Sequence, residues 1–222
     1  MNVSEAVASR RSVRAFLDKP VDMALLRDLI ERAGRAPSGG NLQPWHIHVV
    51  SGPAMDRLKA IMRARLAEAP FGDPPEYAVY PSPLGEPYRS RRFQVGEAMY
   101  AGLGIPREDK TARLRWFAGN WQFFGAPVGL FCTLPRDHGA PQWSDCGMFL
   151  QTLMLLLREA GLDSCPQEAW SAHHATVRDF LGLPEAQMLF TGMAIGFRDP
   201  DSPLNQFPVA RAPLDEWARF HD

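Results

Sequence analysis

The chain has 222 residues, of which 45% are hydrophobic and 22% are charged, so it is apolar enough to bury a core and is not disordered. Its formal net charge of -1 argues against a nucleic-acid-binding protein, because such proteins gain much of their affinity by neutralising phosphates. Three widely spaced cysteines form no disulfide framework, and we find no secretory leader and no apolar segment of bilayer length. We therefore expect a cytoplasmic protein.

The spacing of apolar residues predicts alternating helices and strands, with turns where glycine and proline gather. The expected order is a helix at 4–11, a helix at 22–36 capped by Asp22, a turn at 37–44, a strand at 45–51, a helix at 52–69, an irregular loop at 70–87, helices at 88–105 and 109–124, a strand at 126–134, a helix at 144–160, a turn at 164–170, a helix at 174–183, a strand at 187–197 and a proline-rich tail from 198.

The segment "SRRSVRAF" (9–16) concentrates three arginines in eight residues of an almost neutral protein. A guanidinium group offers a planar fork of donors that fits phosphate, and a serine hydroxyl adds another donor. Arg10, Ser12 and Arg14 are therefore candidates for an anion site. A solvated turn is the alternative, and the segment taken alone favours that alternative.

The segment "APSGGNLQPW" (36–45) combines two glycines, which let a ligand approach the backbone, with short neutral donors and acceptors. Ser38, Asn41 and Gln43 suit the polar edge of a heterocycle better than a phosphate. A plain turn between helix and strand is an equal alternative. The rest of the sequence has no complete dinucleotide fingerprint, no metal-ligand spacing and no recognisable catalytic triad, so we expect no metal.

Five segments, taken in their order, resemble the FMN-dependent nitroreductase family: "RRSVRAF", "APSGGNLQPW", "FFGAPVGLF", "DCGMFLQTLMLLLREAGLDSCPQ" and "GMAIGFRDPDSPLNQFPVARAPLDEW". The resemblance runs from about Ser9 to Trp217 and is least clear between 63 and 115. It implies an α+β fold in which helices flank a mixed, mostly antiparallel central sheet. It also implies an intertwined homodimer with FMN at the interface. Each chain would be a single FMN-binding domain over 1–222, with 198–222 as an extended C-terminal arm.

The same resemblance assigns cofactor-binding residues in both subunits. The FMN phosphate and ribityl chain would meet Arg10, Arg11, Ser12 and Arg211, with Arg14 near the pyrimidine end of the flavin. The partner subunit would contribute the turn that holds Pro37, Ser38, Gly39, Asn41 and Gln43. One flavin face would be covered by Pro166, Gln167, Glu168 and Ala169, and Asn120 would reach the polar edge. Relatives often carry a second basic residue two positions before the arginine of "RAPL", where this chain has Val209.

The activity that the resemblance implies is NAD(P)H-dependent reduction of nitroaromatic or similar electron-poor acceptors. Hydride would pass through flavin N5 in a ping-pong sequence, supported by the backbone near Glu168. Because the cofactor carries the chemistry, no side chain is assigned a catalytic role. Five aromatic residues are candidates for stacking on a flat acceptor, with ordinary core packing as the alternative for each: Tyr77, Tyr80, Tyr88, Phe123 and Phe124.

Two other functions remain open from the sequence. The first is the same fold with another small-molecule acceptor, as in quinone or flavin reductases, dehalogenases and azoline oxidases. The second is a flavin-binding storage or sensor module without efficient turnover. Neither alternative involves nucleic acid or a membrane.

Overall fold

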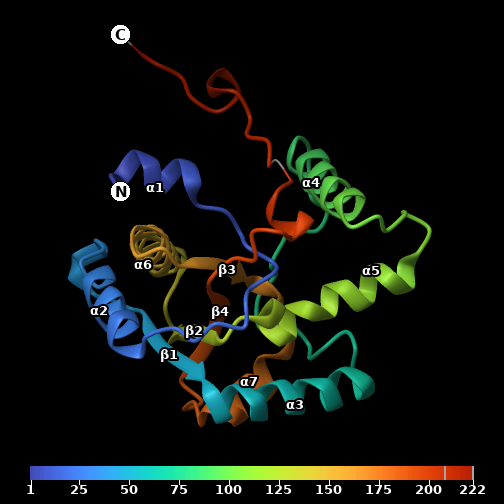
Figure 1. Ribbon diagram of the computed structural model, residues 1–222. Helices are drawn as coiled ribbons and strands as arrows, with labels where there is room; N and C mark the ends of the chain where they lie inside the picture. Colours follow the sequence, from blue (N-terminus) through green and yellow to red (C-terminus); the bar gives the residue numbers. More distant parts are fainter. Residues whose placement is uncertain (208, 222) are drawn as a thin grey trace.

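The computed structural model describes residues 1–207 and 209–221. In this part of the chain the centre is a four-stranded sheet with the order β1-β2-β4-β3 (Figure 1). The strands are β1 (His46–Ser51), β2 (Val128–Pro135), β3 (Asp163–Gln167) and β4 (Gln187–Gly196). All three strand pairings are antiparallel, and the parallel component of the expected mixed sheet is an isolated bridge between Ser12 and Ser164. The predicted α+β class is confirmed.

Helices surround the sheet in the order that the sequence predicted. They are α1 (Val3–Ser9), α2 (Met23–Ala33), α3 (Gly52–Glu68), α4 (Tyr88–Gly102), α5 (Lys110–Phe117), α6 (Ala140–Glu159) and α7 (His174–Leu181). The carboxylate of Asp22 accepts a hydrogen bond from the main-chain N of Ala24 at 2.8 Å, which is the predicted cap of α2. Helix α6 starts earlier than the predicted Ser144, because Pro141 fits the first turn, where its missing N–H has no partner to lose.

Both faces of the sheet are buried, so β2 is buried from Val128 to Leu134 instead of alternating between buried and exposed residues. On one face Leu130 packs with Phe149 of α6 and with residues of α2. On the other face Phe131 packs with Leu58 of α3 and with Trp170. Figure 1 shows the corresponding layers, with α2 and α6 on one side of the sheet and α3 and α7 on the other.

Two predicted elements differ from the structure. The expected turn at 164–170 is wrong, because 163–167 pairs with β4 as strand β3 before the 3-10 helix η3 (Glu168–His173). Strand β3 lies at an edge of the sheet, where Pro166 does not interrupt a ladder of hydrogen bonds. The helix expected over 109–124 ends at Phe117 and continues as the 3-10 segment η2 (Ala118–Gly125), in which Phe123 and Phe124 have φ of 52° and 51°.

Beyond β4 the chain is irregular apart from the short turns η4 (Pro203–Asn205) and η5 (Leu214–Glu216). Figure 1 shows this tail passing α4 and then leaving the body of the molecule. Pro208 and Asp222, which belong to the arm predicted over 198–222, lie outside the described residues. Within the described part, none of the helices has both the length and the apolarity to cross a bilayer.

Candidate functional site

A cavity of about 410 Å³ lies between the segment that follows α1 and the C-terminal tail. We call it the cationic pocket, because its wall includes Arg10, Arg11, Ser12, Arg14 and Arg211. Helix α1 ends at Ser9, and the main-chain N of Val13 then donates to the carbonyl of Ser164 at 3.0 Å, which fixes this segment against the edge of β3. The structure thus brings together arginines that the sequence places near opposite ends of the chain.

The arginines of the cationic pocket lack acidic partners within 1–207 and 209–221. Among the described residues, none of the four forms an ion pair with a carboxylate. Burial and the nearby charge of Arg211 lower the pKa of Arg10. A bound anion would reduce the electrostatic repulsion between these guanidinium groups. The donor set therefore fits a phosphate monoester, which carries nearly two negative charges.

Sequence reasoning missed one polar residue of this pocket, Asn205. Its side chain accepts a hydrogen bond from the main-chain N of Arg14 at 3.0 Å and donates to the carbonyl of Ala15 at 2.8 Å. A lone asparagine in an aperiodic tail gives no sequence signal. Only the folded chain places it beside a segment 191 positions earlier.

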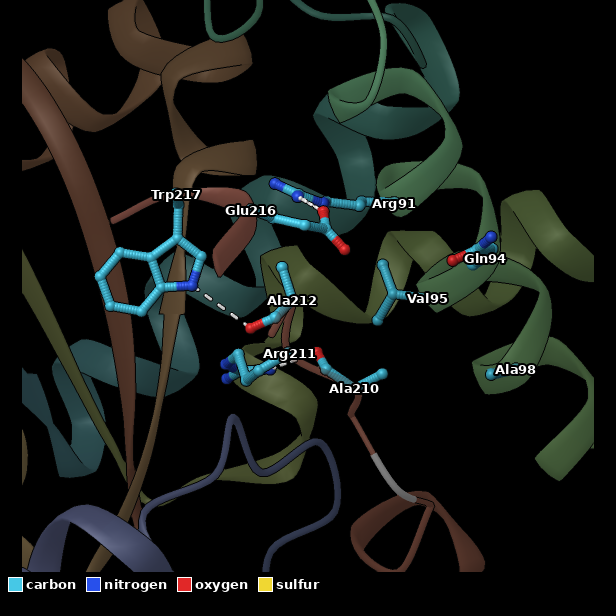
Figure 2. Close-up of a pocket in the computed structure, with 9 residues that line it drawn as sticks. All are labelled: Arg91, Gln94, Val95, Ala98, Ala210, Arg211, Ala212, Glu216 and Trp217. Atoms are coloured by element: carbon cyan, nitrogen blue, oxygen red, sulfur yellow. Dashed lines mark hydrogen bonds and ion pairs between the residues drawn. The ribbon is translucent and has the colours of Figure 1, made fainter. Parts of the chain in front are cut away.

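A second cavity, of about 730 Å³, adjoins the cationic pocket and shares Val95 and Arg211 with it. Figure 2 shows Arg211 on the tail, with Glu216 of the tail paired to Arg91 of α4. The Arg91 Nη2 to Glu216 Oε2 distance is 2.6 Å. The Arg211 guanidinium donates to the carbonyls of its own segment, so its main-chain position decides where its charge lies.

The predicted flavin-covering residues 166–169 lie at the end of β3, where Gln167 faces inward. Its side chain is 2% exposed and donates to the carbonyl of Asn120 at 2.8 Å and to the Asn120 Oδ1 at 3.3 Å. Two predicted site residues are therefore in direct contact, although they are distant in sequence. The side-chain amide of Gln167 is already hydrogen-bonded to Asn120. A ligand bound at Pro166, Glu168 or Ala169 would therefore contact the main chain of Gln167 and not its side chain.

The turn that contains η1 (Gly39–Asn41) lies apart from the cationic pocket and contributes none of its lining residues. Asn41 and Gln43 have positive φ of 57° and 49°, a strained conformation that is concentrated at functional sites. The turn is held by Asp145 of α6, whose carboxylate accepts from the main-chain N of Gly39 at 3.2 Å, and by the Ser38 hydroxyl. Within the described residues the Asn41 side chain makes no hydrogen bond. The predicted members of this turn are Pro37, Ser38, Gly39, Asn41 and Gln43.

The five aromatic candidates do not gather in one place, and none of them lines either cavity. The Tyr77 hydroxyl donates to the Phe190 carbonyl, and burial raises the pKa of Tyr77 to about 12. Phe123 is fully buried, with its ring centroid 4.7 Å from that of Trp170. The positions of Tyr77 and Phe123 favour core packing over substrate stacking.

The other three aromatic candidates are more exposed. Tyr88 begins α4, and its side chain is 61% exposed. The ring of Tyr80 lies 4.1 Å from the Arg92 guanidinium, and Phe124 packs against Trp116 at 5.6 Å between ring centroids. The exposed Tyr80 and Tyr88 remain accessible to a ligand or another subunit, whereas Phe124 is half-buried and packs against the core.

Comparison with known sequences finds the same family along most of the chain. The sequence model of the nitroreductase family matches residues 7–197. A nitrobenzene nitroreductase from Ectopseudomonas oleovorans is 39% identical over 98% of this chain and 96% of the relative. A 4-nitrobenzoate reductase from Pseudomonas putida is 38% identical over 96% of this chain and 93% of the relative.

Solved structures agree with the sequence relatives. The FMN- and NADPH-dependent nitroreductase NfnB from Sphigopyxis sp. strain HMH superimposes with a TM-score of 0.97 at 52% identity, over 100% of both chains. The FMN-dependent NfnB from Mycobacterium smegmatis, solved in complex with NADPH, gives a TM-score of 0.93 at 34% identity, over 99% of this chain and 98% of the other.

Proposed function

Because this chain belongs to the nitroreductase family, we propose that it is an FMN-dependent oxidoreductase that uses NAD(P)H to reduce nitroaromatic compounds. The observation that carries the proposal is the cationic pocket, where four arginines meet with no carboxylate partner in the described part of the chain. The substrates named for the relatives, nitrobenzene and 4-nitrobenzoate, favour a nitroaromatic acceptor over the quinone, halogen and azoline alternatives. The NADPH dependence of the Sphigopyxis enzyme favours NADPH as the donor.

The residues of the cationic pocket fit the phosphate end of FMN. Arg10 and Arg211 would neutralise the phosphate, with Arg11 and the Ser12 hydroxyl as further donors, and this would remove the repulsion between the guanidinium groups. Arg14 would hold its positive charge near the pyrimidine end. The main chain at 166–169 and Asn120, linked by Gln167, would line the flavin ring.

When bound, FMN would supply the two-electron redox chemistry that links NAD(P)H to the acceptor. The protein therefore needs no nucleophile or general acid of its own. The task of its side chains is to bind the phosphate, orient the ring and hold positive charge near the part of the ring that becomes anionic on reduction.

We also propose a cytoplasmic homodimer in which each chain is a single domain over 1–222, with 198–222 as the arm. The turn at 37–43 supports the dimer, because its strained residues and the unbonded Asn41 lie outside the pocket of their own chain. A partner subunit would bring this turn to the flavin. The three buried, unbridged cysteines support a reducing compartment.

The first test is an anaerobic visible spectrum of the purified protein. A flavin spectrum that bleaches with NADPH or NADH, and returns on addition of nitrobenzene, supports the proposed reaction. A protein that stays colourless after incubation with FMN overturns the cofactor assignment. A yellow protein that neither nucleotide bleaches would instead support a storage or sensor module.

A further inference from the structure

The Asn205 side chain connects the two walls of the cationic pocket. Its Oδ1 accepts a hydrogen bond from the main-chain N of Arg14 at 3.0 Å. Its Nδ2 donates to the main-chain carbonyls of Ala15 and Asp199, both at 2.8 Å. An amide is the side chain that provides a donor and an acceptor on the same planar group, so neither a carboxylate nor an alanine can reproduce these bonds.

Few other contacts join the two walls. Main-chain hydrogen bonds connect them as far as Asp199, whose N donates to the Ala15 carbonyl at 3.0 Å. Further along the tail, the Arg11 guanidinium reaches the Phe207 carbonyl only at 3.4 Å. Among the described residues, no ion pair crosses from 10–14 to the tail. Between Asp199 and Arg211, η4 packs against α4, and Asn205 supplies the shortest hydrogen bonds among the described residues from the tail to the segment after α1.

The need for such a connection follows from the charges. Arg10 and Arg211 repel each other, and Arg211 is exposed on an irregular segment that could move away from the pocket. The polar atoms of Asn205 are engaged by the main chain, so its amide is not directed at a ligand. Its effect on anion binding would therefore be indirect.

We propose that Asn205 is a positioning residue that holds the tail against the Arg10–Arg14 segment, so that Arg211 and Arg10 act on one phosphate. This inference rests on the proposed FMN site. It predicts that loss of the Asn205 amide weakens recognition of the phosphate and spares recognition of the flavin ring. It also predicts that an aspartate fails, because Asn205→Asp keeps the acceptor but faces two carbonyl oxygens with a carboxylate.

The test compares FMN with riboflavin, which has the same ring and no phosphate. Protein stripped of flavin is titrated with each compound, and affinity is measured by quenching of flavin fluorescence. For Asn205→Ala and Asn205→Asp we expect FMN affinity to fall by about tenfold, the size of one or two lost hydrogen bonds, and riboflavin affinity to change little. Gln206→Ala is the matched control, because among the described residues the neighbouring Gln206 amide hydrogen-bonds to Pro200 of the tail and not to the Arg10–Arg14 segment. The control should keep both affinities.

Arg10→Ala separates failure of this inference from failure of the proposed site. If Arg10→Ala lowers the ratio of FMN to riboflavin affinity and neither Asn205 variant does, the pocket holds the phosphate but Asn205 does not position it. If Arg10→Ala and Arg211→Ala also leave the ratio unchanged, the phosphate binds elsewhere and the inference falls with the site. Melting temperatures of the stripped variants show whether each has folded. If Asn205→Ala unfolds, Asn205→Leu decides the question, because leucine is close to asparagine in size, makes no hydrogen bond and adds no charge to the pocket.

Discussion

The Arg14 side chain, like that of Arg211, turns back on its own segment. Its Nη1 donates to the Ser12 carbonyl at 3.2 Å, and its main-chain N is bound by Asn205. A positive charge fixed in this way stabilises the anionic, reduced form of a bound flavin more than the neutral, oxidised form. Arg14→Ala should therefore make bound FMN harder to reduce, lowering its midpoint potential by roughly 30–60 mV, which is one to two tenfold steps for two electrons.

The measurement for Arg14 is a redox titration against a dye of known potential. Arg14→Lys is the control, since it keeps the charge and should keep most of the potential. An unchanged potential in Arg14→Ala would place the anionic end of the flavin away from this residue.

His173 has no exposed surface, and within the described residues neither ring nitrogen has a hydrogen-bond partner. Its ring stands edge-on to Trp121 at 4.8 Å between centroids. Burial lowers the pKa of His173 in the folded state, with Asp73 acting weakly in the opposite direction. The neutral ring therefore stabilises the fold above the unfolded pKa near 6.5, and this stability is lost as the pH falls below that value.

His173→Phe should reduce the loss of stability between pH 7 and pH 5. One proton contributes at most about 1.4 kcal/mol per pH unit to the free energy of unfolding, measured by urea denaturation at each pH. Part of the dependence should remain, because burial also lowers the pKa of His48. Equal slopes for the wild type and the variant would exclude His173 as a source.

At the level of the elements, the sheet and η3 approach so closely at Gly192 that a side chain does not fit. A Cβ at Gly192 would lie 2.3 Å from Cδ1 of Trp170, which packs against Phe123 and Phe131. Gly192→Ala should therefore destabilise the protein by about 1–3 kcal/mol in chemical denaturation. Gly85→Ala, with open space around its Cβ, is the control and should change stability by less than about 0.5 kcal/mol.

The elements with a clear period were predictable from the sequence, and those without one were not. The pattern before Ala33 and its cap at Asp22 located α2, and the apolar run from Val128 to Cys132 located β2. Strand β3 was missed because five residues that include a proline carry no strand pattern, and pairing with β4 is what makes them extended. The left-handed Phe123 was missed for a similar reason, since tertiary packing around Trp170 holds it there.

The residues of the candidate site also divide into those that the sequence predicted and those that only the fold reveals. Arg10, Ser12 and Arg211 belong to segments whose combination resembles the family, so the sequence predicted them as site residues. Only the folded chain shows that they line the same cavity. Asn205 and the link between Gln167 and Asn120 depend on distances across the fold. No local sequence pattern predicts the role of Asn205 or the contact between Gln167 and Asn120.

For the whole molecule, the proposed dimer makes a prediction about mixed subunits. If each flavin site combines Arg10 of one chain with Asn41 of the other, Arg10→Ala and Asn41→Ala chains should complement each other. Their heterodimer would contain one intact site and one site with both changes. The two variants are given different tags, co-expressed and purified through both tags. The resulting heterodimer should bind FMN tightly at one of its two sites, which is about half the amount that the wild type binds.

The parent homodimers, each with two altered sites, should bind FMN weakly and serve as controls. If the heterodimer binds no better than they do, the two residues act on one site within the same chain. If gel filtration shows one chain alone with full FMN binding, the dimer itself is excluded.

The distance of 191 positions between Arg14 and Asn205 sets an order of events during synthesis. The Arg10–Arg14 segment leaves the ribosome long before the tail, and the intervening chain contains every strand of the sheet. A nascent chain can therefore begin to build its sheet while its anion site still lacks Arg211. If the cationic pocket holds the FMN phosphate as proposed, the phosphate binds only after the tail has been translated. The cofactor would then stabilise a chain that has already folded and would not direct its early folding.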